Sequence, residues 1–262
     1  MSSMVDDQEP EELAEATLIS HLIELRSRIM KAMLAVGIVF LCLVPFAQEI
    51  FSIVSAPLRE ALPEGMNPIA TRVASPFLTP FMTTLFVSLF LAMPVVLYQI
   101  WQFVAPGLYR REKRFAFPLL VSSIVLFYSG VAFAYYVVFP LIFSFFAAVT
   151  PEGVAMTPDI GEYLTFVLTL FLAFGVAFEV PIATVMLIWS GLVSIEKLKA
   201  ARPYVFLGAF VIGMFLTPPD VISQTLLALP MYALYEAGLF MSRYMLRDKL
   251  QDKALSVEES EP

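Results

Sequence analysis

The sequence has few of the residues on which metal binding, disulfide bonding and most catalysis depend. Its 262 residues include one cysteine and one histidine, so it can form no internal disulfide and lacks the ligands of a His- or Cys-based metal site. The patterns GxxxxGK[ST], HExxH and GxSxG do not occur, and the histidine, His21, precedes the first apolar segment. We therefore predict no catalytic residue, no metal and no cofactor, which disfavours an enzyme.

Charge is also scarce. Charged residues make up 15% of the chain and hydrophobic residues 59%, with a mean hydropathy of +0.81, whereas a soluble domain carries about 25% charge. The net charge of −7 comes mainly from an acidic first segment and from the final VEESEP. The composition predicts a polytopic protein embedded in a lipid bilayer, with nucleic acid excluded as a partner.

Apolar segments predict an all-α fold with six membrane-spanning helices. We expect them at about residues 30–47, 78–104, 115–140, 164–190, 204–216 and 221–241. The whole six-span domain covers residues 18–243 and begins with an amphipathic surface helix. Residues 1–17 are expected to be an acidic, disordered tail without the features of a cleaved leader, and residues 244–262 a C-terminal tail.

The connections between spans predict the orientation and two special features. Only Arg59 and Arg72, of sixteen bases, fall on the side opposite the N-terminus, so the positive-inside rule places both termini in the cytoplasm. Residues 48–77 are rich in proline and contain one short amphipathic pattern, which we interpret as a periplasmic cap. The fifth segment has 13 residues and reaches only about 20 Å as a helix, so it should thin the bilayer locally.

Glu179 and Pro181 lie inside the fourth apolar segment, in the sequence FLAFGVAFEVP. A charged side chain at the centre of a spanning helix costs about 2.5 to 3.5 kcal/mol, so Glu179 should face other helices or a cavity. Pro181 has no amide hydrogen to donate and should kink the helix. Three roles stay open for Glu179: a proton relay, a contact for a partner helix, or a carboxyl bonded to a neighbouring span.

Two further carboxylates stand among clustered bases on the predicted cytoplasmic side. Glu24 and Glu112 are candidates for binding a cationic ligand, since guanidinium groups prefer carboxylate partners. Local pairing is the alternative: Glu24 with Arg28 at i, i+4, and Glu112 with the four bases beside it. Phe103 and Leu108, close to Glu112 in sequence, could equally be interface or packing residues.

Several motifs together resemble the TatC family, the polytopic core subunit of the twin-arginine protein translocase. They are SHLIELRSR from Ser20, VASPF from Val73, APGLYRREKR from Ala105, AFGVAFEVP from Ala173 and GMFLTPPDVISQTLLALPMY from Gly213. The resemblance implies export of folded proteins across the bacterial inner membrane, driven by the proton motive force. It also implies a scaffold of kinked helices with a concave face, self-association, and partnership with the single-span subunits TatA and TatB.

The resemblance also assigns residues. Twin-arginine signal peptides would be recognised by Glu24, Arg26, Phe103, Leu108 and Glu112. Partner helices would meet Glu179 and Pro181, with Met214, Thr217 and Gln224 helping to dock them. Pro57, Phe77 and Asp220 would matter on the periplasmic side, and Asp220 is in addition predicted from the sequence TPPD to cap the sixth span.

Two other classes of function compete with this interpretation. A secondary transporter of a small solute, coupled to ions or protons through Glu179, would be expected to show internal repeats, and no convincing self-similarity is found. A membrane protease would need a histidine or two aspartates at membrane depth, whereas Asp220 is alone in a turn.

Overall fold

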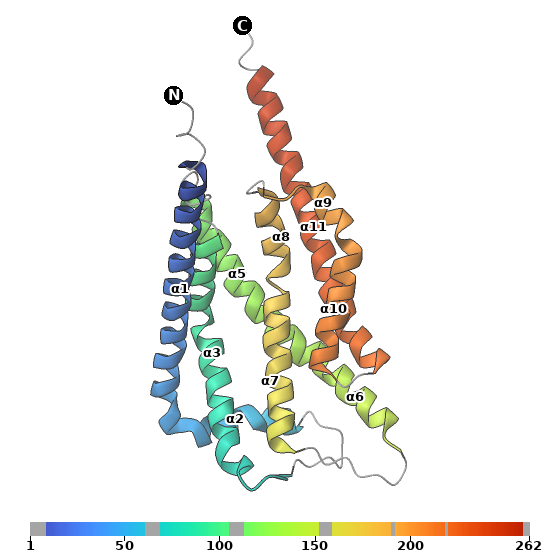
Figure 1. Cartoon of the computed structure of the whole chain (residues 1–262). Coiled ribbons are helices and arrows are strands. Elements are labelled where there is room, and N and C mark those ends of the chain that lie inside the picture. Colours follow the sequence, from blue (N-terminus) through green and yellow to red (C-terminus); the bar gives the residue numbers. More distant parts are fainter. Residues whose placement is uncertain are drawn as a thin grey trace.

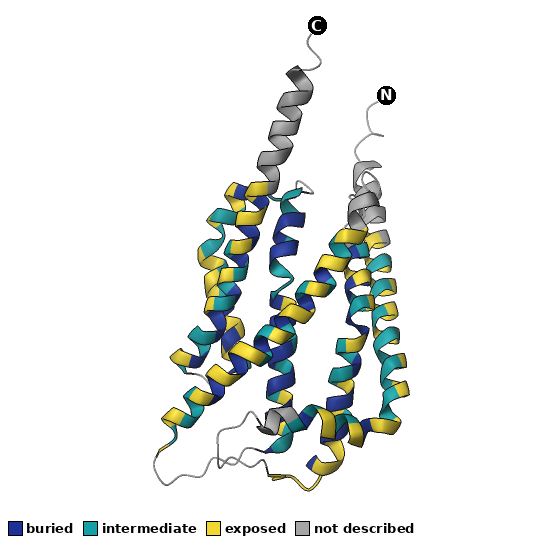
Figure 2. Ribbon diagram, turned by 180° about the vertical axis from the view of Figure 1, so that it is seen from behind, coloured by how far each residue is buried: buried dark blue, intermediate teal, exposed yellow. Residues whose placement is uncertain are grey.

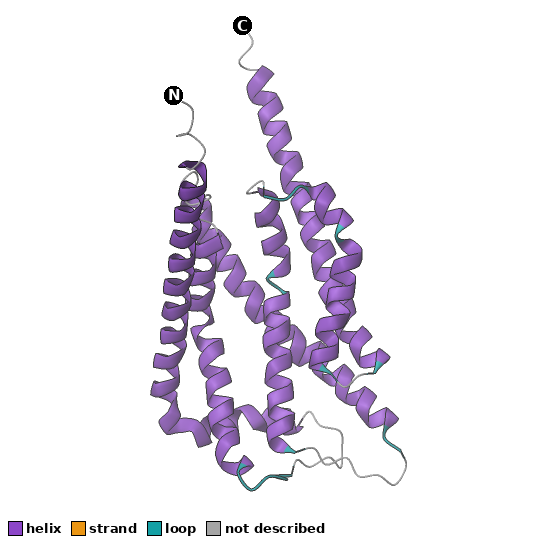
Figure 3. Ribbon diagram, in the orientation of Figure 1, coloured by secondary structure: helices purple, strands orange, loops and turns teal. Residues whose placement is uncertain are grey.

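The computed structural model is built of helices (Figure 3). It describes residues 9–60, 69–104, 113–151, 159–189, 192–217 and 220–258. Within these ranges the sole β-type pairing is an isolated bridge between Ile69 and Asp159. The prediction of an all-α fold is confirmed.

Twelve helical elements follow one another in the described residues. They are α1 (Glu9–Leu43), η1 (Val44–Phe46), α2 (Ala47–Glu60), α3 (Ser75–Val104), α5 (Lys113–Phe133), η2 (Ala134–Val138), α6 (Phe139–Val149), α7 (Ile160–Ala177), α8 (Val180–Trp189), α9 (Ile195–Ala200), α10 (Arg202–Leu216) and α11 (Val221–Glu258).

Four stretches of the described chain are long and apolar enough to cross a membrane. They are His21–Ala56, Ser75–Phe103, Phe117–Val149 and Ile160–Trp189, and the shorter Arg202–Leu216 is apolar as well. These stretches overlap the first five predicted spans, and α11 includes the segment predicted as the sixth. Many large apolar side chains on them are exposed, as expected where lipid replaces water as the solvent.

The ends of the chain are more helical than a count of apolar residues suggests. α1 begins at Glu9, inside the segment 1–17 predicted to be a disordered tail, where the sequence EPEELAEA is rich in strong helix formers. α11 continues to Glu258, through most of the predicted tail 244–262. The short amphipathic helix predicted between residues 48 and 77 is present as α2, which packs against α3.

The third predicted span is bent within its length. Its helix runs as α5, passes through one turn of π-helix in η2, and continues as α6, with Pro140 in the first turn of α6. A π turn inserts a residue into the helical ladder, which is a recognised cause of bending. In Figure 1 this long element crosses behind α7 at a steep angle.

The α7–α8 pair lies at the centre of the molecule. Half of the residues in its most apolar part are buried inside the fold, whereas none are in the most apolar part of the α1–α2 stretch. Figure 2 shows this contrast. α5 can cross α7 closely because both helices carry a glycine at the crossing. A Cβ on Gly130 would lie 2.5 Å from the carbonyl oxygen of Phe174, and one on Gly175 would lie 2.5 Å from the ring of Phe127.

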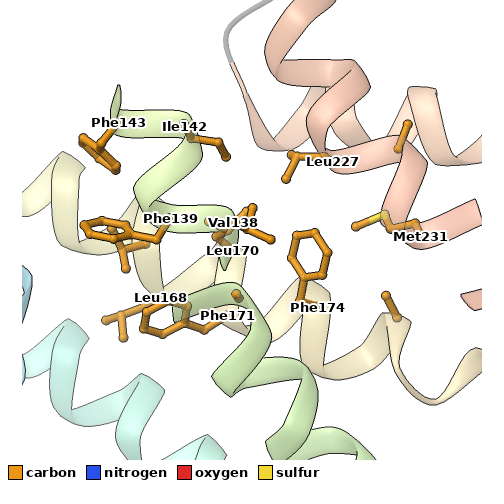
Figure 4. Packing of buried hydrophobic residues seen from close by; sticks show 14 of the residues in the cluster. Val138, Phe139, Ile142, Phe143, Leu168, Leu170, Phe171, Phe174, Leu227 and Met231 are labelled. Carbon is orange, nitrogen blue, oxygen red and sulfur yellow. The ribbon is translucent and has the colours of Figure 1, made fainter. Parts of the chain in front are cut away.

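The largest apolar core joins η2, α6, α7 and α11 (Figure 4). Phe139, Phe174 and Leu227 are completely buried in it. α11 also packs along α8 and α10, while α1 packs along α3. The first turns of α1 and the last turns of α11 lie at the same end of the molecule (Figure 1).

Candidate functional site

One candidate site lies where the first half of α1 meets the last turns of α3. Arg28 donates from Nη2 to Glu24 Oε1 at 3.2 Å and from Nη1 to Gln99 Oε1 at 3.3 Å, and Nη1 also donates to Gln102 Oε1. The guanidinium group therefore joins the two helices. The local pairing of Glu24 with Arg28, one of the two alternatives drawn from the sequence, is present.

Glu24 nevertheless remains accessible. Its side chain is 38% exposed and the side chain of Arg28 is 23% exposed, so the ion pair can exchange partners in contact with water. Arg26, on the same helix, is exposed. Phe103 stacks on His21 with ring centroids 4.4 Å apart, which brings a third predicted residue to this junction of α1 and α3.

Leu108 and Glu112 lie outside the described residues, so three of the five residues predicted to bind a signal peptide are placed. Sequence reasoning missed Gln99 and Gln102. The sequence did point to them, since two glutamines in YQIWQF at the end of an apolar segment are polar groups that need partners at the membrane boundary.

The second candidate site surrounds Glu179, at the interruption between α7 and α8. α7 ends at Ala177 and α8 begins at Val180, so the kink predicted from Pro181 is present as a break just before that proline. Ser123 of α5 donates from Oγ to Glu179 Oε2. Trp101 of α3 donates from Nε1 to Ser123 Oγ at 2.8 Å, so three helices converge on one carboxyl group.

The two oxygens of Glu179 differ. Oε2 accepts the Ser123 hydroxyl, while Oε1 is buried and has no hydrogen-bond partner among the described residues. Of the three roles left open for Glu179, bonding to a neighbouring span is therefore observed. Sequence reasoning missed both Ser123 and Trp101.

A third candidate site is the turn between α10 and α11. The prediction that Asp220 caps the last helix is confirmed, because its Oδ1 accepts the backbone N–H of Ser223 at 2.7 Å. Thr217 is buried and donates to the carbonyl of Gly213 at 2.9 Å. Met214 is 48% exposed, and Gln224 lies against Gly213, so all three predicted docking residues gather at this turn.

Asp159, which sequence reasoning missed, connects the segment before α3 to the start of α7. Its carboxylate accepts Thr71 N at 2.7 Å, Thr71 Oγ1 at 2.6 Å and two amides of the first turn of α7. The Thr71 hydroxyl and amide, followed by the α7 amides, lower the Asp159 pKa from 3.8 to about 2. Of the predicted periplasmic residues, Pro57 lies in α2 and Phe77 is exposed in the first turn of α3.

A cavity of about 520 Å³ lies between α3 and α7, close to the end of α10. Hydroxyl groups of Thr79, Thr83 and Thr169 line it together with apolar side chains. Arg72 and Glu162, which also line it, form an exposed ion pair at 2.8 Å. Glu179 is not part of this cavity.

Comparisons with known proteins agree with this arrangement. The family model described as "Sec-independent protein translocase protein (TatC)" matches residues 20–230. The chain is 63% identical to the TatC protein of Azotobacter chroococcum mcd 1, over 88% of this chain and 91% of that protein. It is 55% identical to TatC of Escherichia coli (strain K12), over 92% and 90% respectively.

A solved structure is similar as well. A crystal structure titled "Twin Arginine Translocase Receptor- TatC" superposes with a TM-score of 0.77 at 38% identity, covering 86% of this chain and 98% of that one. These matches favour the translocase interpretation over the small-solute transporter. The chain therefore belongs to the TatC family and is a component of a Sec-independent protein translocase, not an enzyme.

Proposed function

We propose that this protein is the receptor and scaffold subunit of a twin-arginine translocase in a bacterial inner membrane. It captures a signal peptide bearing consecutive arginines at the junction of α1 and α3. With single-span TatA and TatB subunits it then exports the folded cargo, driven by the proton motive force. The observation that carries this proposal is the partly exposed Glu24, which already binds a guanidinium group, in a chain of this family.

In this proposal, the signal peptide is captured when one of its arginines replaces Arg28 at the carboxylate of Glu24. Arg28 is held by Gln99 and Gln102 as well as by Glu24, so it keeps hydrogen-bond acceptors when a signal arginine takes its place at the carboxylate. A carboxylate can accept a guanidinium group through both oxygens, which lysine cannot match. Glu112 supplies the second carboxylate, with Arg26, Phe103 and Leu108 beside the bound peptide.

The proposed topology has six spans with both termini in the cytoplasm and residues 48–77 as a periplasmic cap. The asymmetry of the bases supports it, and so does the position of the first turns of α1 and the last turns of α11 at one end (Figure 1), which requires an even number of crossings. The 15 residues of α10 reach only about 22 Å, which supports local thinning of the bilayer.

Partner helices dock at two places in this proposal. One is the concave face around Glu179 and Pro181, where a carboxyl group within an apolar segment is the polar feature. The other is the α10–α11 turn, where Met214, Thr217 and Gln224 gather. Both surfaces also serve self-association of the receptor into a larger complex.

Photocrosslinking tests the capture site. A crosslinker placed beside the arginines of a signal peptide should label wild-type protein strongly. Glu24→Ala should label about tenfold less, the effect of one lost charge-assisted hydrogen bond, and should affect an uncharged peptide less. Glu49→Ala, which removes an exposed acid from α2, is the matched control and should label normally. Equal losses for both peptides with Glu24→Ala would contradict the proposal.

A further inference from the structure

The cavity between α3 and α7 has a charged mouth and an apolar interior. Arg72, Asp159 and Glu162 line its mouth, at the end of the molecule where α3 and α7 begin (Figure 1). Phe86 and Leu168 line it farther along the same two helices, about 12 to 17 Å from those helix starts. Because both apolar stretches begin with these helices, the cavity runs from the membrane boundary into the depth of the bilayer.

The interior of the cavity offers mainly hydrocarbon contacts. Leu168 closes it from α7, while the side chains of Met82 and Phe215 beside it are 53% and 81% exposed. The hydroxyl of Thr83 also faces it, but that hydroxyl donates to the carbonyl of Thr79 in its own helix at 2.9 Å. A ligand that fills this part of the cavity is therefore apolar.

The volume of the cavity excludes a membrane-spanning helix as its occupant. The cavity measures about 520 Å³. A helix about 10 Å in diameter takes roughly 420 Å³ for each 5.4 Å turn, so only about one turn would fit. A spanning helix has about 20 residues, which make more than five turns. A flexible hydrocarbon chain can fill such a space, and its volume is typical of sites for small ligands.

The mouth of the cavity presents both signs of charge to the surroundings. The ion pair joins Nη2 of Arg72 to Oε1 of Glu162 at 2.8 Å, and the two side chains are 73% and 67% exposed. A guanidinium group has five N–H donors and a carboxylate accepts about four hydrogen bonds, so each group can bind a further ligand atom. A phosphate matches the guanidinium group, and an ammonium group matches the carboxylate.

Asp159 adds a second negative charge at this mouth. Its pKa is about 2, so it is ionised at neutral pH, and the three side chains carry one positive and two negative charges. This balance disfavours a headgroup with a net negative charge. It favours a headgroup in which the phosphate is accompanied by a cation. A primary ammonium group has three N–H donors, which are lost when it is trimethylated.

We propose that this cavity binds one phospholipid with a primary amine in its headgroup, of the phosphatidylethanolamine type. Its phosphate accepts from Arg72, its ammonium group donates to Glu162, and one acyl chain lies between α3 and α7. α3 begins at this cavity and ends at the junction with α1, so the lipid is bound apart from the residues proposed to capture a signal peptide.

Native mass spectrometry of the full-length protein, purified in detergent and freed of lipid, tests this proposal. Lipids with identical acyl chains are added one at a time. Phosphatidylethanolamine should bind about tenfold better than phosphatidylglycerol, the effect of one charge-assisted hydrogen bond, and phosphatidylcholine should also bind less well. Equal binding of all three lipids would overturn the role of the mouth. Phosphoethanolamine, which has no acyl chain, should not bind, and its binding as tightly as the lipid would overturn the role of the interior.

Variants at the mouth separate a headgroup site from a structural ion pair. Arg72→Ala should bind phosphatidylethanolamine about tenfold less, while Arg243→Ala, which removes an exposed arginine of α11, should bind it normally. Glu162→Gln should lose the preference for phosphatidylethanolamine and bind phosphatidylglycerol better, because the mouth becomes less negative. Melting curves without added lipid confirm that each variant is folded. An unchanged lipid preference in folded Glu162→Gln would overturn the proposal.

Variants at Thr165, an exposed residue in the lining of the cavity, test the interior. Thr165→Phe fills part of the space, so it should lower the binding of every lipid alike and leave the order of preference unchanged. A changed order with unchanged total binding would overturn the placement of the acyl chain. A photocrosslinking residue at position 165 in native membranes should give an adduct with the mass of a phospholipid. A protein adduct in its place would overturn the assignment to a lipid.

Discussion

Glu24 and Glu179 have the same side chain but lie in two different environments. Glu24 is 38% exposed and pairs with a guanidinium group at 3.2 Å. Glu179 lies at the break in a central, half-buried helix pair, and among the described residues its carboxyl contacts a hydroxyl group instead of a cation. Water near Glu24 lets ions change partners at little cost, whereas the apolar surroundings of Glu179 hold its hydrogen bond in place.

In the proposed function, one polypeptide uses carboxyl groups for two tasks. An exposed carboxylate beside a removable cation suits reversible capture of arginine. A carboxyl group that is hydrogen-bonded to a neighbouring helix in apolar surroundings suits a fixed place between helices. Variants that act on only one of the two sites can separate these tasks.

Gly130→Ala should have the largest effect, and it should act on the Glu179 side alone. The new Cβ would lie 2.5 Å from Phe174 O and 2.9 Å from the ring of Phe178. Such overpacking costs about 1 to 3 kcal/mol and would move α5, with Ser123, away from α7. We expect export of a folded reporter to fall about fivefold or more, since 1.4 kcal/mol corresponds to a factor of ten.

Signal-peptide crosslinking measures the other site in the same variant and should be retained. Gly37→Ala is the control, because no atom beyond the neighbouring backbone of its own helix lies within 4 Å of its new Cβ. Export at the wild-type level in Gly130→Ala would show that the close crossing of α5 and α7 is not required.

Gln102→Leu should act on the Glu24 side alone. Without one of the amides that hold Arg28, the guanidinium group depends more on Glu24 and competes harder with an incoming arginine. We expect binding of a twin-arginine peptide to weaken several-fold, in line with about 1 kcal/mol for one hydrogen bond, measured by crosslinking. Gln48→Leu, at an exposed position, should bind normally. Tighter peptide binding in Gln102→Leu would contradict this account of exchange.

Asp159 is a third carboxylate to compare, and N–H and O–H donors hold it in place. The variant Asp159→Asn removes its charge. The Asp159 pKa is lowered from 3.8 to about 2, so its stabilising effect is complete above about pH 4 and is lost as the pH falls through 2. The melting temperature of the variant in detergent should lie below that of wild type at neutral pH, and the two should converge between pH 4 and pH 2. Curves that stay parallel over this range would contradict the assignment.

Arg72→Ala should have the smallest effect. The Arg72–Glu162 ion pair is 2.8 Å long, but its two side chains are 73% and 67% exposed. Exposed pairs of this kind contribute at most about 1 kcal/mol. Melting temperature and export should both stay close to wild type, in contrast to Asp159→Asn. A loss comparable to that of Asp159→Asn would show that this end of the molecule depends on the ion pair.

Features that depend on neighbours in sequence could be predicted from the sequence. The apolar runs gave the membrane helices, TPPD gave the cap at Asp220, and Pro181 gave the break beside Glu179. The pair of Glu24 and Arg28 at i, i+4 was foreseen as an alternative for the same reason.

Features that depend on distant parts of the chain could not be predicted. Ser123 is 56 residues from Glu179 in sequence, and Asp159 is 88 residues from Thr71. A single serine or tryptophan in an apolar run leaves no periodic pattern, so only the packing of helices shows which polar group it meets. The role of the glycines at the crossing of α5 and α7 could not be predicted for the same reason, because the close approach that requires them appears only when both helices are in place.

The last turns of α3 have neighbours on two sides. Gln99, Gln102 and Phe103 contact α1, whereas Trp101 contacts Ser123 on α5. A helix held in this way cannot turn about its axis to follow α1 without pulling the indole away from its acceptor. A small rotation of α3 that follows α1 would thus break the hydrogen bond between Trp101 and Ser123, so the surroundings of Glu24 and of Glu179 are mechanically linked through one helix.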